Sequence, residues 1–243
     1  MNINLNPNSE LNQSIVNVPD VVQVPDVWVN EARQFRMAMM MYACAIREVK
    51  TKLEVLNDEL SIKNQRNPIE MIKSRVKKPM SILEKLQRRG LPVSVESMVK
   101  NLDDVAGIRI ICSFTSDIYQ IAEMIAAQGD VTVIHVKDYI KNPKPNGYKS
   151  YHMVVTVPVY LTDGPVETKV EIQIRSVAMD FWASLEHKIA YKFEGNAPEG
   201  LLHELKDCAD VVDMLDKKMF SLNEAITAYA KEHQETDPDR EQI

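Results

Sequence analysis

The strongest constraint on the fold is a regular alternation of apolar and polar residues between Pro165 and Arg175. Because successive side chains of a strand point to opposite faces, this alternation predicts a β-strand with one buried face. The apolar face carries Val170, Ile172 and Ile174, and the polar face carries Lys169, Glu171, Gln173 and Arg175. The pattern leaves the role of the polar face open, since half-buried strands commonly have a solvated side and this side could equally carry a carboxylate into a site.

The other periodic segments predict an α+β fold. Runs of apolar and β-branched residues predict three more strands, at Val105–Phe114, Val131–Val136 and Met153–Val159. A helix capped by Ser116 or Asp117 is predicted to end near Gln128. Another is predicted from Ser176 to about Phe193, with inward residues Ala178, Trp182, Leu185, Ile189 and Phe193. We therefore expect a mixed sheet of about five strands flanked by helices.

Two long helices are predicted at the ends of the chain. The first runs from Asp26 to about Asn64 and carries a heptad stripe of Phe35, Met39, Tyr42, Ile46, Val49, Leu53, Leu56 and Leu60. The second follows Gly200 and carries Leu205, Cys208, Val212, Leu215, Met219, Leu222 and Ile226. Both stripes are suitable subunit contacts. Residues 1–25 are expected to form a flexible arm, 26–230 the folded domain, and 231–243 a frayed acidic tail.

Composition and charge exclude several classes of protein. A net charge of −6 over 243 residues argues against a general nucleic-acid binder, which needs a broad cationic surface. The three cysteines are odd in number and widely spaced, so they suggest neither a disulfide framework nor a zinc site. Apolar runs fall short of the roughly 18 residues that span a bilayer, and no basic residue precedes Arg33 as a signal sequence requires. We expect a soluble protein of the cytoplasm.

Positive charge is concentrated between Lys73 and Arg89, where seven bases and one acid give a local charge of +6. Pro79 suits the first turn of a helix that ends at Gly90. On that helix Ser81, Lys85 and Arg88 share a face, while Arg75 and Lys77 lie just before its N-terminus. A solvated basic face is the usual fate of such a run, but its clustering in an acidic protein favours a polyphosphate site.

A second basic cluster lies between Lys137 and His152, where prolines, a glycine and asparagines predict a loop. Its cations are Lys137, Lys141, Lys144 and Lys149, and its tyrosines are Tyr139, Tyr148 and Tyr151. Cations that meet phosphates, beside aromatic faces that stack on a base, are typical of a nucleotide pocket. The alternative is a solvated basic loop with tyrosines packed beneath it.

Two carboxylates at strand positions, Asp104 and Glu171, complete the candidate chemistry. Carboxylates that hold Mg²⁺ while lysines and arginines neutralise phosphates are the common equipment of phosphoryl and nucleotidyl transfer. The sequence has no Gly-x-x-x-x-Gly-Lys-Ser/Thr loop, so side chains must hold the phosphates. Arg109, alone within a β-branched run, requires an anion or a stacking partner.

Four motifs in order resemble the synthetase domain of the RelA/SpoT family, and the chain is similar to its single-domain small alarmone synthetases. The motifs are Arg75-x-Lys77-x-x-x-Ser81, Asp104-Val-Ala-Gly107-Ile-Arg109, the stretch from Asn142 to His152, and Glu171-Ile-Gln173-Ile-Arg175 followed by Met179 to His187. The resemblance covers about residues 26–230. It implies a nucleotidyltransferase-like synthetase fold and transfer of pyrophosphate from ATP to the 3′-hydroxyl of GTP or GDP, giving pppGpp or ppGpp and AMP in the stringent response.

The resemblance also implies roles for individual residues. Arg75 and Arg109 would sandwich the adenine of ATP, and its phosphates would be held by Lys77, Ser81, Lys85 and Arg88, with Lys137 nearby. Asp104 would bind Mg²⁺, and Glu171 would assist that metal and orient or deprotonate the attacking hydroxyl. Tyr148 would stack on guanine, Lys144 and His152 would take the acceptor's phosphates, and Asn146 and Gln173 belong to the same GTP or GDP site. The separate roles of Lys78 and Lys137 stay open.

Family members that also hydrolyse alarmones carry a His-Asp pair, and none of the five histidines here is followed by Asp, so synthesis without hydrolysis is predicted. The family forms homotetramers, which implies a homo-oligomer here, although the sequence alone does not distinguish a tetramer from a dimer. Control is expected through expression or through nucleotides bound at the oligomer centre, with (p)ppGpp or RNA as candidate regulators. Two alternatives remain: a related nucleotidyltransferase that acts on RNA ends, and a non-enzymatic RNA-binding regulator.

Overall fold

The computed structural model describes residues 26–64, 66–192 and 198–234, and the predicted N-terminal arm lies outside them. The elements in order are α1 (Asp26–Asn64), β1 (Ile69–Val76), α2 (Pro79–Arg88), α3 (Val95–Asn101), β2 (Ala106–Cys112), α4 (Thr115–Ala126), β3 (Thr132–Asp138), β4 (Tyr151–Leu161), β5 (Gly164–Ser176), α5 (Val177–Lys192) and α6 (Glu199–Gln234).

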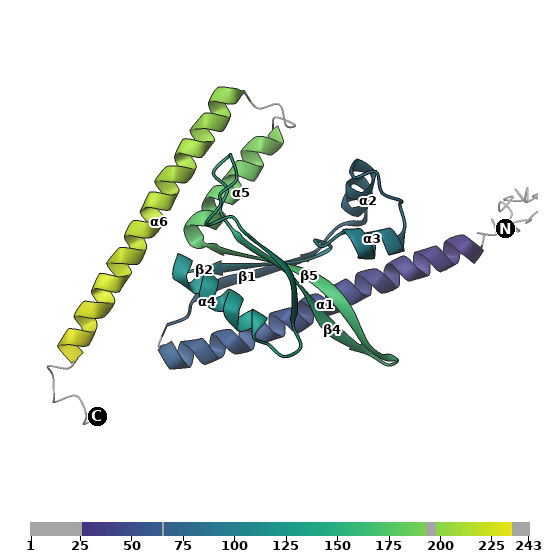
Figure 1. Cartoon of the computed structure of the whole chain (residues 1–243), viewed down its shortest axis with the longest axis horizontal. Helices are drawn as coiled ribbons and strands as arrows, with labels where there is room; N and C mark the ends of the chain where they lie inside the picture. The colour runs from purple at the N-terminus through teal and green to yellow at the C-terminus, as the bar shows by residue number, and fades with distance from the viewer. Residues whose placement is uncertain (1–25, 65, 193–197, 235–243) are drawn as a thin grey trace, which may run out of the picture.

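A five-stranded sheet with the order β1-β2-β5-β4-β3 forms the centre of the molecule (Figure 1). Strands β2 and β5 pair in parallel, and the other three pairings are antiparallel. The predicted α+β fold with a mixed sheet is therefore confirmed. The parallel pair requires a long crossover, and α4, β3 and β4 provide it between β2 and β5.

One face of the sheet is apolar and is covered by α1, which crosses it diagonally, and by α4 (Figure 1). The predicted inward side chains of β5, Val170, Ile172 and Ile174, are fully buried there. The heptad stripe of α1 is buried on the same face from Tyr42 to Leu60. Its prediction as a subunit contact is wrong for this part of the stripe, because the helix uses it to close the core of its own chain.

Strand β1 was not among the strands predicted from the sequence. Its eight residues, Ile69 to Val76, include only one buried side chain, Ile69, and the strand lies at the edge of the sheet. An edge strand with charged side chains lacks the apolar run that marks a central strand. The basic run from Lys73 to Arg89 is thus divided between β1 and the predicted helix α2, which has Pro79 in its first turn.

Helices α5 and α6 pack against each other in opposite directions on one side of the sheet (Figure 1). Ser176 caps α5 as predicted, because its hydroxyl accepts a 3.2 Å hydrogen bond from the Met179 N–H. Trp182 is buried and donates its indole N–H to the Leu205 carbonyl at 3.0 Å. Leu185 was predicted to point inward but is 41% exposed, and Phe193 lies outside the described residues.

The C-terminal stripe on α6 is buried only near its start. Leu205 and Ala209 pack against Trp182, whereas Leu215, Met219, Leu222 and Ile226 are all more than half exposed. The helix continues to Gln234, so residues 231–234 are helical although the sequence placed them in the tail, and the rest of that tail lies outside the described residues. Within the described ranges, no helix is both long and apolar enough to cross a membrane.

Candidate active site

The polar face of the sheet carries a row of functional side chains, one from each strand. The strand register pairs Lys73 of β1 with Arg109 of β2, Arg109 with Gln173 of β5, Gln173 with His152 of β4, and His152 with Lys137 of β3. Paired residues of neighbouring strands point to the same face, so five segments far apart in sequence meet in one line. The polar side of the alternating strand is therefore part of this face rather than a separate solvated surface.

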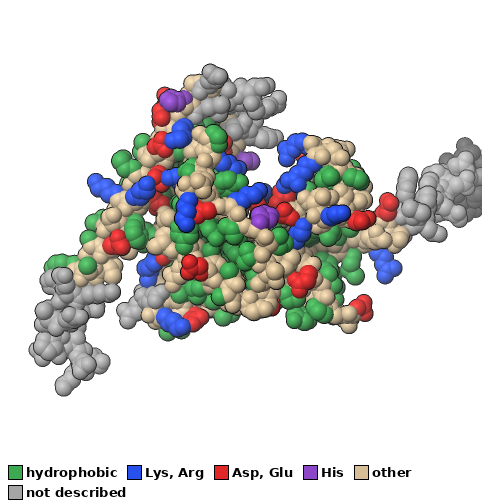
Figure 2. Space-filling view, in the orientation of Figure 1, with side chains coloured by type: hydrophobic (Ala, Val, Ile, Leu, Met, Phe, Trp, Pro, Cys, Tyr) green, Lys and Arg blue, Asp and Glu red, His purple; other side chains and the backbone are tan. Residues whose placement is uncertain are grey.

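A pocket of about 600 Å³, open to solvent on one side, lies over the β1–β2–β5 part of this face. In Figure 2, basic, acidic and His side chains gather in this region between α5 and α2, above an apolar area. The pocket is lined by Lys73, Ser74, Arg75, Asp104, Gly107, Ile108, Arg109, Glu171 and Gln173. Four of the predicted donor and catalytic residues, Arg75, Arg109, Asp104 and Glu171, are thus brought into one cavity.

Asp104 is held by two lysines of the basic run. Lys77 Nζ lies 2.9 Å and Lys85 Nζ 2.7 Å from Asp104 Oδ2, whereas the buried Oδ1 atom has no hydrogen-bond partner. Burial acts to raise the pKa of Asp104, but the hydrogen bonds and charges of Lys85 and Lys77 outweigh it and hold the pKa below its ordinary value. The carboxylate is therefore ionised at neutral pH, with one oxygen left unsatisfied.

Glu171 lies two residues before Gln173 on β5, and the two side chains are hydrogen bonded. Gln173 Nε2 donates to Glu171 Oε2 at 3.0 Å, and His152 Nδ1 lies 3.6 Å from Glu171 Oε1. Burial raises the pKa of Glu171, yet the contacts with His152 and Gln173 prevail and the pKa lies below its usual value. The charge of Asp104 acts in the opposite direction, which reflects the closeness of the two carboxylates.

These two carboxylates fit Mg²⁺. The unpaired, buried Oδ1 of Asp104 is an oxygen ligand without a partner, and Glu171 lines the same pocket. Mg²⁺ is usually bound by one or two carboxylates together with substrate phosphates and waters, rather than by a cage of protein ligands. The described part of the chain contains no cluster of three or more His, Cys, Asp or Glu side chains that could hold a metal ion.

Arg109, a charged residue within a largely apolar strand, is paired with an acidic residue. Its Nη1 atom lies 3.3 Å from Asp180 Oδ1 on α5, but its buried Nε has no hydrogen-bond partner. Burial and the positive charges of Arg175 and Arg75 together lower the pKa of Arg109, against the charges of Asp180 and Tyr148, which raise it. The guanidinium is thus only partly satisfied and faces the pocket beside Arg75.

The β3–β4 loop, residues 139–150, brings an aromatic cluster to the other end of the polar row. Tyr148 Oη and His152 Nε2 are 2.8 Å apart, and the rings of Tyr139 and His152 contact edge to face with centroids 5.1 Å apart. Lys144 Nζ lies 4.8 Å from the centre of the Tyr148 ring and 4.9 Å from that of Tyr139. The predicted combination of a cation and aromatic faces is therefore present where Lys144 meets the Tyr139 and Tyr148 rings.

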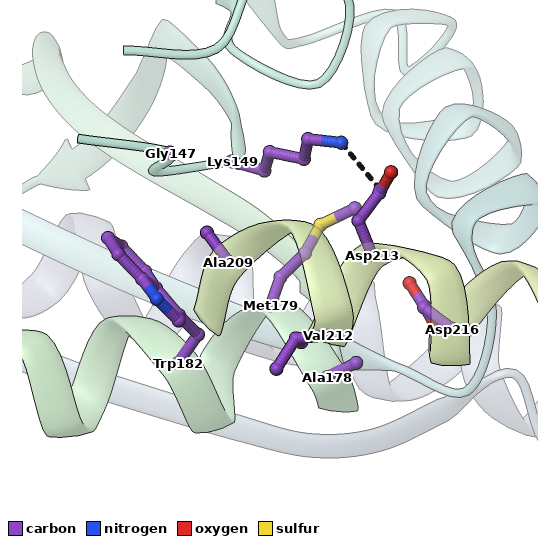
Figure 3. A pocket seen from close by; sticks show the side chains of 9 residues that line it. All are labelled: Gly147, Lys149, Ala178, Met179, Trp182, Ala209, Val212, Asp213 and Asp216. Atoms are coloured by element: carbon purple, nitrogen blue, oxygen red, sulfur yellow. Dashed lines mark ion pairs between the residues drawn. The ribbon is translucent and has the colours of Figure 1, made fainter. Parts of the chain in front are cut away.

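The same loop is attached to α5 and α6. Gly147 adopts a φ of +86° and lies so close to Ala209 of α6 that a Cβ at position 147 would be 2.4 Å from the Ala209 Cβ. Lys149 Nζ forms a 2.5 Å ion pair with Asp213 of α6, as Figure 3 shows, and Asn146 Nδ2 donates to Glu186 of α5 at 3.2 Å. The C-terminal helix therefore supports the loop that carries Tyr148.

Comparison with known proteins gives the family. A sequence profile described as the region found in RelA / SpoT proteins matches residues 74–196. The chain is 41% identical over 213 residues to the GTP pyrophosphokinase YwaC of Bacillus subtilis, a match that covers 88% of this chain and 98% of YwaC. The chain belongs to the RelA/SpoT family.

Two further RelA/SpoT relatives support the assignment. The GTP pyrophosphokinase YjbM of Bacillus subtilis is 38% identical over 187 residues, which cover 77% of this chain and 87% of YjbM. The solved structure of small alarmone synthetase 1 from Bacillus subtilis, bound to its product pppGpp, has a TM-score of 0.74 at 36% identity and covers 80% of this chain and 99% of that one. The sheet and its helices are thus those of a small alarmone synthetase.

Not every predicted RelA/SpoT site residue contacts the pocket. Lys85 reaches Asp104 from α2, but Ser81 and Arg88 lie on the same helix outside the pocket lining, with Arg88 exposed. Lys137 is exposed at the far end of the polar row, and Lys144 is exposed on the loop. Their proposed contacts with phosphates therefore stay predictions.

Sequence reasoning missed three residues of the site. Lys73 lines the pocket and lies 4.0 Å from Asp180, and Arg175 is 4% exposed and donates to Asp180 at 3.0 Å. The alternation placed Arg175 on the polar face, which was a usable signal that the residue belongs to the site. Asp180 lies within the fourth family motif, but the resemblance assigned it no role, and an acid in the first turn of a helix is ordinary.

Proposed function

We propose that this chain is a GTP pyrophosphokinase that transfers pyrophosphate from ATP to the 3′-hydroxyl of GTP or GDP, giving pppGpp or ppGpp and AMP. The observation that carries the proposal is a pocket lined by Asp104 and Glu171 together with Arg75 and Arg109. Lys77 and Lys85 bind Asp104 beside it, and His152, which lies next to Glu171, is hydrogen bonded to Tyr148. Two separate nucleotide-binding surfaces that meet at two carboxylates suit a transfer between two nucleotides. The names of YwaC and YjbM agree with this activity.

On the donor side, Arg75 and Arg109 are proposed to bind the adenine of ATP between their guanidinium groups. Both line the pocket on adjacent strands, and the unpaired Nε of Arg109 is available for a stacking or hydrogen-bonded ligand. Lys77, Ser81, Lys85, Arg88 and Lys137 are proposed to hold the donor phosphates. Lys77 and Lys85 are both paired with Asp104, so the donor phosphates would compete with that carboxylate for the same two lysines.

The proposed cofactor is Mg²⁺, held by Asp104 with help from Glu171. When bound, it would neutralise charge on the transferred group and fix the donor phosphates in line with the acceptor. Release of Lys77 and Lys85 toward the phosphates would leave both oxygens of Asp104 free. Positioning and charge neutralisation then supply most of the catalysis.

Glu171 is proposed to orient the attacking 3′-hydroxyl and to accept its proton. Its pKa lies below the ordinary value, so the group is ionised at neutral pH and can accept a hydrogen bond from the hydroxyl. A low pKa also makes it a weak base, which favours orientation before the bond forms and proton transfer late in the reaction. Hydrogen bonding to Gln173 fixes the carboxylate for this role.

On the acceptor side, Tyr148 is proposed to stack on guanine, while Lys144 and His152 bind the acceptor phosphates and Asn146 and Gln173 complete the site. Lys144, one of two cations at the Tyr148 ring, is exposed, so it can leave the ring for a phosphate and free a face for a base.

The exposed stripe of α6 supports a homo-oligomer, which we propose to be a tetramer of the synthetase domain, residues 26–230, in the cytoplasm. Leu215, Met219, Leu222 and Ile226 recur at helical spacing along α6 and are all more than half exposed, as a helix contact with a second copy requires. Binding of (p)ppGpp or RNA by the oligomer is proposed as its means of control. Hydrolysis of the product is not part of the proposal, since the sequence has no His-Asp pair.

Incubation of the pure protein with Mg²⁺, γ-labelled ATP and either GTP or GDP tests the proposal, with products resolved by anion exchange. We expect a labelled guanosine penta- or tetraphosphate together with AMP, and loss of both in Asp104→Ala and Glu171→Gln. Intact ATP with either acceptor, even after addition of pppGpp as an activator, would contradict the proposal.

A further inference from the structure

Arg175 is a nearly buried cation whose four partners come from three different segments. Its side chain is at the end of β5, and the residue is only 4% exposed. Nη1 donates to Asp180 on α5 at 3.0 Å, Nε donates to the Ser150 hydroxyl at 3.3 Å, and Nη2 donates both to the Tyr148 hydroxyl at 2.6 Å and to the Gln173 amide oxygen at 3.1 Å. A buried guanidinium fixes its neighbours because each lost bond leaves a desolvated donor.

Two of these bonds hold the β3–β4 loop from beneath. Tyr148 and Ser150 belong to that loop, and the Tyr148 hydroxyl is held between Arg175 and His152. Lys144 and Arg175 are the two cations that contact the Tyr148 ring, at 4.8 and 5.1 Å from its centre. Lys144 is exposed and can move away, whereas Arg175 is buried and remains in place. The orientation of the ring therefore depends on Arg175.

A third bond determines which way the Gln173 amide faces. Arg175 has only donors, so the amide oxygen of Gln173 must point to it, and the amide nitrogen is left to donate to Glu171. A chain of hydrogen bonds then runs from Arg175 through Gln173 to the carboxylate at the centre of the pocket. Without Arg175 the amide could rotate by half a turn and present its oxygen to Glu171, which would repel it.

We propose that Arg175 is a positioning residue for the acceptor nucleotide: it fixes the Tyr148 ring and the Gln173 amide, and through them the guanine and Glu171. The inference rests on the proposed function for the identity of the acceptor. Arg175 touches neither substrate in this account and acts through the two side chains that do. Its loss should affect acceptor binding much more than ATP binding.

The test compares Arg175→Lys, Tyr148→Phe and the double variant. Lysine keeps the charge but cannot make the forked set of bonds, and phenylalanine keeps the ring but removes the hydroxyl that Arg175 holds. We expect Arg175→Lys to weaken GDP binding and to raise the KM for GDP by about tenfold or more, the loss expected from one charge-assisted hydrogen bond. ATP affinity should change less than about threefold. The combined effect in the double variant should be smaller than the product of the two single effects, because both changes remove the Arg175–Tyr148 hydrogen bond.

Arg66→Lys is the matched control for a purely structural effect. Arg66 is another arginine that binds a buried carboxylate, that of Asp117 at the start of α4, on the apolar side of the sheet. Its variant should lower the melting temperature and leave the affinities for GDP and ATP unchanged. Calorimetric titration of each protein with GDP alone and with ATP alone measures this without turnover.

The proposal is overturned if Arg175→Lys binds GDP within twofold of the wild type, or if it loses GDP and ATP affinity equally. It is also overturned if the effects of Arg175→Lys and Tyr148→Phe simply multiply in the double variant. Should Arg175→Lys fail to fold, the GDP affinity of Tyr148→Phe is the test. If that affinity equals the wild-type value, the proposal is rejected. A wild type that binds GDP but makes no alarmone would refute the proposed function and leave this comparison of affinities valid.

Discussion

Replacement of Gly147 by alanine tests whether the β3–β4 loop must dock on α6 for the acceptor site to form. Gly147 combines a φ of +86° with close packing, since a Cβ there would meet Ala209 Cβ at 2.4 Å and Lys206 Cδ at 3.2 Å. The flexible lysine side chain can move aside, but Ala209 is fixed on its helix. The loop of Gly147→Ala must therefore lift from α6 or force the two elements apart.

The size of the effect follows from two contributions. The left-handed conformation costs an alanine about 1–2 kcal/mol relative to glycine. Overpacking against Ala209 adds about 1–3 kcal/mol if the loop stays in place. If the loop lifts instead, the overpacking is relieved, but the Lys149–Asp213 and Asn146–Glu186 contacts are lost. Either response displaces Tyr148, so we expect the KM for GDP or GTP to rise at least about tenfold with little change in the KM for ATP.

Gly90→Ala is the control that isolates backbone strain. Gly90 has a φ of +65°, and a Cβ there would meet nothing within 4 Å. Thermal unfolding of both variants should show a larger loss for Gly147→Ala, by about 2–4 °C for each additional kcal/mol. Steady-state kinetics should show an acceptor defect in Gly147→Ala alone. If the two variants have the same melting temperature and the same acceptor KM, docking on α6 does not shape the site.

Three further results are expected. Asp104→Asn frees Lys77 and Lys85 for phosphates, so it should bind metal-free ATP more tightly than the wild type in calorimetry while losing transfer. Lys149→Met should lower the free energy of unfolding at neutral pH by about 1 kcal/mol, because the pair is partly exposed and Lys217 still contacts Asp213 at 2.9 Å. Burial acts to raise the pKa of Asp213, but its lysine partners hold it below the ordinary 3.8, so this stabilisation is complete above that pH and is lost as the pH falls through the lower, folded-state value. Denaturant titrations of the wild type and Lys149→Met should therefore differ at pH 5 and converge at strongly acidic pH.

Elements with a clear periodicity were predictable from the sequence. The alternation around Glu171 gave the strand, its buried side and its polar side, because one face of that strand packs on α1 and the other faces the pocket. Ser176 and Pro79 marked the starts of their helices, since capping depends on neighbours in sequence. Local chemistry of this kind can be read without knowledge of the fold.

Features set by distant contacts could not be predicted. Strand β1 was missed because an edge strand in a basic segment needs no apolar run, and its pairing with β2 is a tertiary property. The α1 stripe had the spacing of a coiled coil, but a helix that crosses a sheet buries a similar stripe. Three basic residues from three different strands surround Asp180 of α5: Arg109 of β2, Arg175 of β5 and Lys73 of β1. No spacing in the sequence predicts that they meet.

The central claim is that the chain moves a pyrophosphate group as a unit to one hydroxyl of a guanosine nucleotide. Phosphorus NMR of a reaction with Mg²⁺, ATP and GDP, run in parallel with 3′-deoxy-GDP, tests this claim most directly. The account predicts equal amounts of AMP and ppGpp, with a new diphosphate signal on the 3′-oxygen, and an unchanged mixture when the acceptor lacks that oxygen. Formation of ADP, release of free pyrophosphate as the main product, or transfer to 3′-deoxy-GDP would contradict it.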